Sequence, residues 1–271
     1  MRTVEFGFVI QLLALAVVSL VAHPVNGAEL TLAAKAAVLM DAQTGKVVGA
    51  KNRDLPLAPA STVKILTALV VLERSRIDEV VAIPAEALRV SGAKAQLQAG
   101  EKRKVGDLLH AMMLGSGNDA ALALGLHGDK SLSRFVEQMN RKARALSAVH
   151  SHFANPTGMP HPSQRTTAHD LALIAKASME NAELRRIVGT RTYPWKSLQR
   201  QMTLTNSNKL LGAYEGAIGV KTGNTREAGY CLVAAAERGG KAYIAVVLNS
   251  GEKTVWQDAI KLLDYGFKRA A

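Results

Sequence analysis

The segment from residue 62 to residue 73 is apolar nearly all round, and a serine and a lysine stand at its start. Its apolar members are Val63, Ile65, Leu66, Ala68, Leu69, Val70, Val71 and Leu72. A helix without a polar face is a buried helix, so this segment predicts a helix inside the core. Ser61 and Lys64 are three residues apart and share one face of it, so the lysine amine can reach the serine hydroxyl. The chain must therefore fold around a polar pair at the first turn of a buried helix.

Two further short motifs follow Ser61-Thr62-Val63-Lys64 along the chain, Ser116-Gly117-Asn118 and Lys221-Thr222-Gly223. Taken singly, each motif has an ordinary structural interpretation: a surface lysine on a helix, a serine in a turn, or the end of a strand. Together and in this order, on a buried helix start, a turn and a strand, they favour a catalytic group. Such a set is typical of serine enzymes that react with penicillin.

Strand patterns occur at both ends of the chain, and helix patterns occupy its middle. Two short apolar runs within residues 36–50 predict a β-hairpin, and two longer runs within residues 229–249 predict another. Apolar or amphipathic segments predict helices over residues 105–113, 118–126, 132–146, 167–177 and 255–267. These patterns predict an α/β (α+β) fold: one antiparallel sheet built from both ends of the chain and flanked by helices, with a helical lobe inserted between them.

This topology places Ser61 and Lys221 side by side, with Ser116 facing them across a groove between the lobes. We expect Ser61 to be the nucleophile, which needs a base within hydrogen-bond reach. Lys64 can be that general base only if its amine is neutral, and burial and a second cation at Lys221 both lower a lysine pKa. We expect Ser116 to relay the proton to the leaving nitrogen, and Asn118 to grip a substrate carbonyl or to orient Lys64.

The third motif suits the binding of an extended peptide. Lys221, Thr222 and Gly223 on a strand would hold a peptide by the strand edge and meet its terminal carboxylate through Lys221 and Thr222. Backbone amides, one of them from Ser61, would stabilise the oxyanion.

The overall charge and the histidines point to no other ligand. The 271-residue chain carries a net charge of +12, but aromatic residues make up only 4% of it and no Lys/Arg run exceeds three, so nucleic acid is not expected. The charge suits an anionic wall or membrane surface. The pair His150 and His152 lacks a third metal ligand at a convincing spacing, so neither a metal nor another cofactor is predicted. A triad using His169 and Asp170 lacks a nucleophile-elbow sequence.

The amino-terminal residues predict export. Met1-Arg2 supplies a thin positive region, residues 6–22 are apolar apart from Gln11 and Ser19, and small residues follow at Gly27-Ala28. Residues 1–28 are therefore expected to be a signal peptide, with a retained membrane anchor as the alternative. Either way the protein would act in the periplasm or extracytoplasmic space.

With these motifs, the chain resembles the D-alanyl-D-alanine carboxypeptidase family, the low-molecular-mass penicillin-binding proteins. The resemblance extends over about residues 30 to 268 and includes the residues that flank each motif. The segments that carry it are residues 59–69, 113–121, 153–158, 166–172, 219–225 and 228–234. The resemblance implies a DD-peptidase and β-lactamase-like fold. It also implies removal of the terminal D-alanine from peptidoglycan stem pentapeptides through an acyl-enzyme on Ser61, and acylation of Ser61 by β-lactam antibiotics.

Two departures from the family qualify this expectation. Many members carry a second, β-rich domain and then an amphipathic membrane anchor, whereas this sequence stops at Ala271. Residues 29–271 are therefore expected to be a catalytic domain without a C-terminal β-rich domain or C-terminal membrane anchor. Some relatives also place an arginine before the last helix to bind the substrate carboxylate, and here Lys253 is the candidate substitute.

Three rival functions stay open. A class A β-lactamase uses a glutamate to activate the hydrolytic water, generally in a Glu-x-x-Leu-Asn loop, and no such pentapeptide lies between Asn118 and Lys221. A long-lived penicillin adduct is therefore expected. A DD-endopeptidase would cut peptidoglycan cross-links with the same residues. A catalytically silent wall-binding protein is disfavoured because Ser61, Lys64 and Ser116 are intact.

Overall fold

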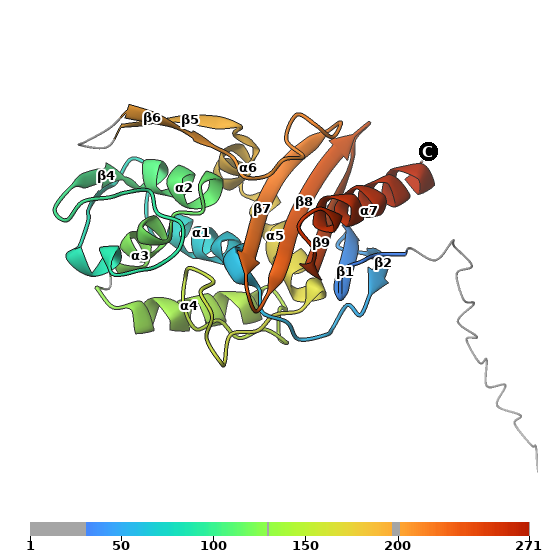
Figure 1. The fold of residues 1–271 in the computed structure, drawn as a ribbon, viewed down its shortest axis with the longest axis horizontal. Coiled ribbons are helices and arrows are strands. Elements are labelled where there is room, and N and C mark those ends of the chain that lie inside the picture. Colours follow the sequence, from blue (N-terminus) through green and yellow to red (C-terminus); the bar gives the residue numbers. More distant parts are fainter. Residues whose placement is uncertain (1–30, 129, 197–200, 271) are drawn as a thin grey trace, which may run out of the picture.

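One five-stranded antiparallel sheet organises the protein. The computed structural model describes residues 31–128, 130–196 and 201–270, and its sheet has the strand order β2-β1-β9-β8-β7 (Figure 1). The strands are β1 Ala36–Asp41, β2 Val47–Lys51, β7 Ala217–Thr225, β8 Gly229–Arg238 and β9 Lys241–Ser250. The first strand pairs with the last, so the two ends of the chain build one sheet, as predicted.

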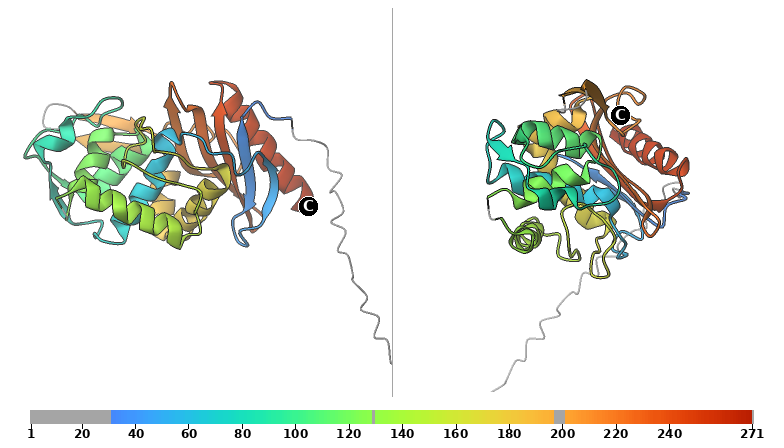
Figure 2. Two further views of the ribbon diagram at one scale, coloured as in Figure 1. Left: turned by 90° about the horizontal axis from the view of Figure 1, so that it is seen from below. Right: turned by 60° about the vertical axis from the view of Figure 1, so that its left-hand side comes forward.

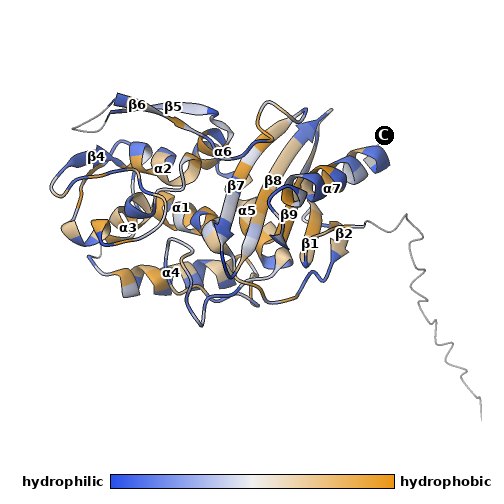
Figure 3. Ribbon diagram, viewed as in Figure 1, coloured by the Kyte–Doolittle hydropathy of each residue, from blue (hydrophilic) through white to orange (hydrophobic). Residues whose placement is uncertain are grey.

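The sheet separates two apolar layers because its side chains alternate between its faces. In β9, Ile244, Val246 and Leu248 belong to one core, while Ala245 and Val247 belong to the other. Helix α5 (Ala168–Glu180) packs on the first face and α7 (Thr254–Ala270) on the second, so both faces are covered (Figure 2). The middle stretches of β8 and β9 are consequently apolar and buried, and their ribbons are tan to orange there (Figure 3).

The helical lobe lies beside the β7 edge of the sheet and is inserted between β2 and β7 in sequence (Figure 1). Its helices are α1 Lys64–Leu72, α2 Val105–Leu114, α3 Asn118–Leu126, α4 Leu132–Ala145 and α6 Ala182–Gly189. Every α1 residue from Lys64 to Val71 is buried, as its lack of a polar face predicts. Side chains cap the later helices: Thr167 accepts from the Asp170 amide at the start of α5.

The start of the central helix differs from the prediction. Residues Ala60–Val63 form a short 3-10 helix, and the α-helix begins at Lys64. The Thr62 hydroxyl donates to the Pro59 carbonyl at 2.6 Å, which stabilises the tight turn before α1. Ser61 therefore lies just before α1, and Lys64 opens it.

Two small ribbons and one helix were not predicted. They are β3 Val80–Ala82 with β4 Lys102–Lys104, β5 Thr192–Lys196 with β6 Gln201–Thr205, and α6. The β5–β6 ribbon buries little besides Trp195 and Leu204, so its sequence lacks the apolar alternation that marks a core strand. Pro194 within β5 further weakens the pattern.

The first described residues are tied to the last helix. The buried Asp258 carboxylate in α7 accepts from the backbone amides of Ala33 at 3.0 Å and Ala34 at 2.8 Å. The predicted export segment, residues 1–28, lies outside the described residues. Among residues 31–128, 130–196 and 201–270, no helix combines the length and apolar character that a membrane span needs.

Candidate active site

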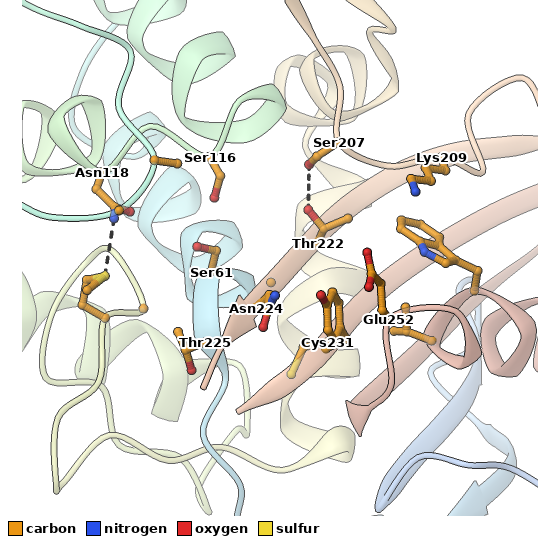
Figure 4. Close-up of a pocket in the computed structure, with 18 residues that line it drawn as sticks. Ser61, Ser116, Asn118, Ser207, Lys209, Thr222, Asn224, Thr225, Cys231 and Glu252 are labelled. Carbon is orange, nitrogen blue, oxygen red and sulfur yellow. Dashed lines mark hydrogen bonds between the residues drawn. The ribbon is translucent and has the colours of Figure 1, made fainter. Parts of the chain in front are cut away.

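The three motifs meet in one pocket between the helical lobe and the β7 edge of the sheet. The pocket has a volume of about 350 Å³, and its walls include Ser61, Ser116, Asn118, Thr222 and Gly223 (Figure 4). Ser61 precedes α1, Ser116 lies between α2 and α3, Asn118 is the first residue of α3, and Thr222 lies on β7. Segments 160 residues apart in sequence are thus brought to one cavity because the sheet contains both ends of the chain.

The serine and lysine of the first motif are in direct contact. Lys64 Nζ lies 2.8 Å from Ser61 Oγ and donates to the Thr157 carbonyl at 2.5 Å. The Lys64 side chain is fully buried. The hydrogen bond to the Thr157 carbonyl fixes the position of the Lys64 amine. The amine is thereby held against the Ser61 hydroxyl. Thr157 was missed in the sequence because its contribution is a backbone carbonyl.

The electrostatic environment favours a neutral amine on Lys64. Burial holds the pKa of Lys64 well below its usual range, and the nearby Lys221 lowers it further, while the Asp119 carboxylate acts in the opposite direction. Burial also lowers the pKa of Lys221, to about 7. A neutral amine carries the free electron pair that a base for Ser61 requires.

Two glycines allow the backbone to close around Ser61. A Cβ on Gly158 would lie 1.9 Å from the Ala60 carbonyl oxygen, and a Cβ on Gly223 would lie 2.9 Å from the Ser61 nitrogen. No side chain fits at either position without displacing the backbone. The Ser61 amide therefore lies directly against β7, where a reacting carbonyl oxygen would meet it.

The second motif forms the opposite wall. Asn118 donates through Nδ2 to the Ser91 carbonyl at 2.7 Å, whereas its buried Oδ1 has no hydrogen-bond partner in the described part of the chain. The neighbouring Asp119 carboxylate accepts from the Ala95 amide at 2.8 Å and the Leu97 amide at 3.2 Å. Asp119 thus anchors the loop that carries Gly92 and Ala93 into the pocket wall. No sequence pattern had indicated this role.

The structure does not bring Lys253 together with the motifs. Its side chain is exposed and is not among the residues that line the pocket. Lys221 is buried, and its Nζ donates to the Thr222 carbonyl at 3.1 Å. The cation that lines the pocket beyond Thr222 is Lys209, from the loop after β6, which the sequence interpretation had not singled out.

Comparison with known proteins assigns the chain to a family. The family model described as D-alanyl-D-alanine carboxypeptidase matches residues 22–252. The chain belongs to the D-alanyl-D-alanine carboxypeptidase family. The resemblance expected from the motifs is therefore confirmed.

Similar members of the D-alanyl-D-alanine carboxypeptidase family come from several bacteria. The chain is 36% identical to D-alanyl-D-alanine carboxypeptidase DacF of Bacillus subtilis over 89% of its own length and 64% of that of DacF. It is 37% identical to a D-alanyl-D-alanine carboxypeptidase of Streptomyces sp. strain K15, over 88% of each chain. The crystal structure of a D-alanyl-D-alanine carboxypeptidase from Mycobacterium tuberculosis H37Rv superposes with a TM-score of 0.84 at 32% identity, covering 88% of this chain and 92% of that chain. The predicted fold class is confirmed.

Replacing Lys221 tests the electrostatic coupling between the two lysines. If Lys64 is the base for Ser61, acylation by benzylpenicillin needs the neutral amine, and the acylation rate should fall as the pH decreases through the lowered pKa of Lys64. Because the Lys221 charge lowers that pKa, Lys221→Met should move this acid limb to higher pH. The limb is measured from acylation rates at saturating benzylpenicillin. Lys241 is exposed, and Lys241→Met makes the same change in formal charge, so this control should leave the acid limb at its wild-type pH. If the acid limb of Lys221→Met stays at that pH or moves to lower pH, the coupling between the two lysines is contradicted.

Proposed function

We propose that the protein is a serine D-alanyl-D-alanine carboxypeptidase that removes the terminal D-alanine from peptidoglycan stem pentapeptides. The contact between Ser61 Oγ and Lys64 Nζ, 2.8 Å apart with the lysine fully buried, carries this proposal. It supplies a nucleophile and a base without a histidine or a metal. The names of the relatives support the substrate, since both curated relatives described above are D-alanyl-D-alanine carboxypeptidases.

Acylation follows from the geometry around Ser61. Neutral Lys64 accepts the Ser61 proton while Oγ attacks the carbonyl carbon of the penultimate D-alanine. The resulting oxyanion lies against backbone amides, including that of Ser61. The bond from this carbon to the nitrogen of the terminal D-alanine then breaks. The nitrogen receives a proton through Ser116, so free D-alanine leaves and an ester remains on Ser61.

Deacylation reverses these roles with water as the nucleophile. Neutral Lys64 accepts a proton from the water as it attacks the ester carbon, and Ser61 Oγ leaves with a proton. The shortened peptide departs with a new terminal carboxylate, and the free enzyme is restored.

The walls of the pocket hold the peptide in an extended conformation. The β7 edge, including Thr222 and Gly223, offers backbone groups to the peptide, as strand addition requires. Asn118 lies on the opposite wall of the pocket, where its amide would contact the peptide. A peptide held between these groups presents its carbonyl carbon to Ser61.

The place of action follows from the substrate. Peptidoglycan lies outside the cytoplasm, so we propose that residues 1–28 export the protein and are either removed or retained as a tether. Residues 29–271 would then be the catalytic domain in the periplasm or extracytoplasmic space. The net charge of +12 favours contact with an anionic wall.

Cleavage of defined muropeptides tests the proposed activity. The protein should release D-alanine from pentapeptide monomers, because Ser61 would attack the bond before a terminal D-alanine. Ser61→Ala should abolish release by removing the nucleophile. Products are separated by chromatography after incubation with pentapeptide monomers and with cross-linked dimers. Conversion of dimers to monomers without free D-alanine would identify a DD-endopeptidase instead.

Penicillin should remain bound to Ser61 once it has reacted. Among the described residues that line the pocket, Glu252 is the only carboxylate, and it lies at the end formed by Lys209 and Trp256 rather than in a Glu-x-x-Leu-Asn loop. We therefore expect one benzylpenicillin per chain in the intact-mass spectrum, located on Ser61 by peptide mapping and absent from Ser61→Ala. Rapid repeated hydrolysis of nitrocefin would instead indicate a β-lactamase.

A further inference from the structure

The pocket continues beyond Thr222 into an end with its own set of charges. Its described walls there include Ser207, Lys209, Glu252 and Trp256 (Figure 4). Lys209 is the only cationic side chain among the described residues that line the pocket, and Glu252 is the only anionic one. No ion pair to Lys209 within 4.0 Å occurs among the residues that the structure describes. The ammonium is therefore available to a ligand.

The loop after β6 fixes the position of Lys209. The flanking residues Asn208 and Leu210 are buried, and the Asn208 side chain accepts from the Leu210 amide at 3.1 Å. Lys209 Nζ lies 5.8 Å from the centre of the Trp256 ring, within the range of a cation–π contact. Rigid backbone and an indole therefore hold an exposed cation at this end of the pocket.

A pair of hydroxyl groups links this loop to the third motif. Ser207 Oγ and Thr222 Oγ1 are 2.6 Å apart, and the Ser207 amide donates to the Leu114 carbonyl at 3.1 Å. A hydroxyl group donates one hydrogen bond and can accept others. When Ser207 donates to Thr222, the Thr222 hydrogen is free to donate to an anion in the pocket. The loop thus supplies both a cation and an oriented hydroxyl.

The buried Lys221 is less suited to this task. Its Nζ already donates to the Thr222 carbonyl, and burial lowers its pKa to about 7, so much of its charge is lost above neutral pH. A carboxylate stays ionised there and requires a cation that stays ionised with it. Lys209 lines the pocket with an exposed side chain, whereas Lys221 is not among the residues that line it.

We infer that Lys209, together with the Ser207–Thr222 hydroxyl pair, recognises the free C-terminal carboxylate of the substrate and thereby selects terminal over internal peptide bonds. This inference rests on the proposed function. Lys209 is then a specificity-determining residue, and Ser207 positions the Thr222 hydroxyl. Glu252 at the same end opposes anions, so a carboxylate is accepted there only where Lys209 offsets the acidic charge.

Two matched lysine variants and two matched peptides test the inference. Lys209→Met and Lys253→Met remove the same charge from two exposed side chains, one lining the pocket and one outside it. The peptides are diacetyl-L-Lys-D-Ala-D-Ala and its C-terminal amide. For Lys209→Met we expect kcat/KM on the acid to fall about tenfold or more, mainly through KM, because a charge-assisted contact is lost. Activity on the amide should be unchanged, and Lys209→Arg should restore the preference for the acid.

The outcomes separate this inference from the proposed function. Lys253→Met should keep the wild-type ratio of kcat/KM on the acid to kcat/KM on the amide. Two results overturn the role of Lys209: loss of that ratio in Lys253→Met alone, or an equal fall of kcat/KM on both peptides in Lys209→Met. Stoichiometric labelling by benzylpenicillin reports that each variant is folded. If the wild type is labelled but cleaves neither peptide, the proposed function fails. In that case benzylpenicillin, which carries a free carboxylate, and its neutral methyl ester replace the two peptides. The ratio of their acylation rates is then compared between Lys209→Met and Lys253→Met.

Discussion

The burial of the Lys64 amine is the interaction on which the rest of the site depends. A lysine removed from water is neutral far more easily than an exposed one, and Lys64 has no exposed surface. Its environment supplies one backbone acceptor at Thr157, one hydroxyl at Ser61 and a second lysine at Lys221. In the proposed function, this environment lets Lys64 act as a base in contact with the nucleophile Ser61.

The fold maintains this arrangement by packing three distant chain segments against one another. Pairing of β1 with β9 joins the ends of the chain, so β7 reaches the start of α1, where Gly223 contacts the Ser61 amide. The loop at Gly158 approaches from the helical lobe and brings the Thr157 carbonyl to Lys64. Small residues at these positions matter because any side chain would separate the segments.

Sequence patterns could predict the main sheet, most helices and the residues of the three motifs, because these depend on apolar periodicity and on residue identity. They could not predict contributions of the backbone: the Thr157 carbonyl would be the same with another side chain at that position. Nor could they predict the loop anchored by Asp119, since its contacts join residues about 24 apart without a repeating pattern. Lys253 was chosen by its place before the last helix, whereas the cation that lines the pocket, Lys209, comes from a loop whose path depends on tertiary packing.

The charge state of Lys64 in the free enzyme tests the central claim most directly. Carbon-13 labelling of the lysine side chains allows the Lys64 signal to be followed by NMR during a pH titration, with assignment from the signals that disappear in Lys64→Arg and Lys221→Arg. The structure predicts that Lys64 changes its charge at a pH well below that of an ordinary lysine, because burial and Lys221 lower its pKa. A Lys64 signal that stays cationic up to about pH 10, as for an ordinary lysine, would contradict the account.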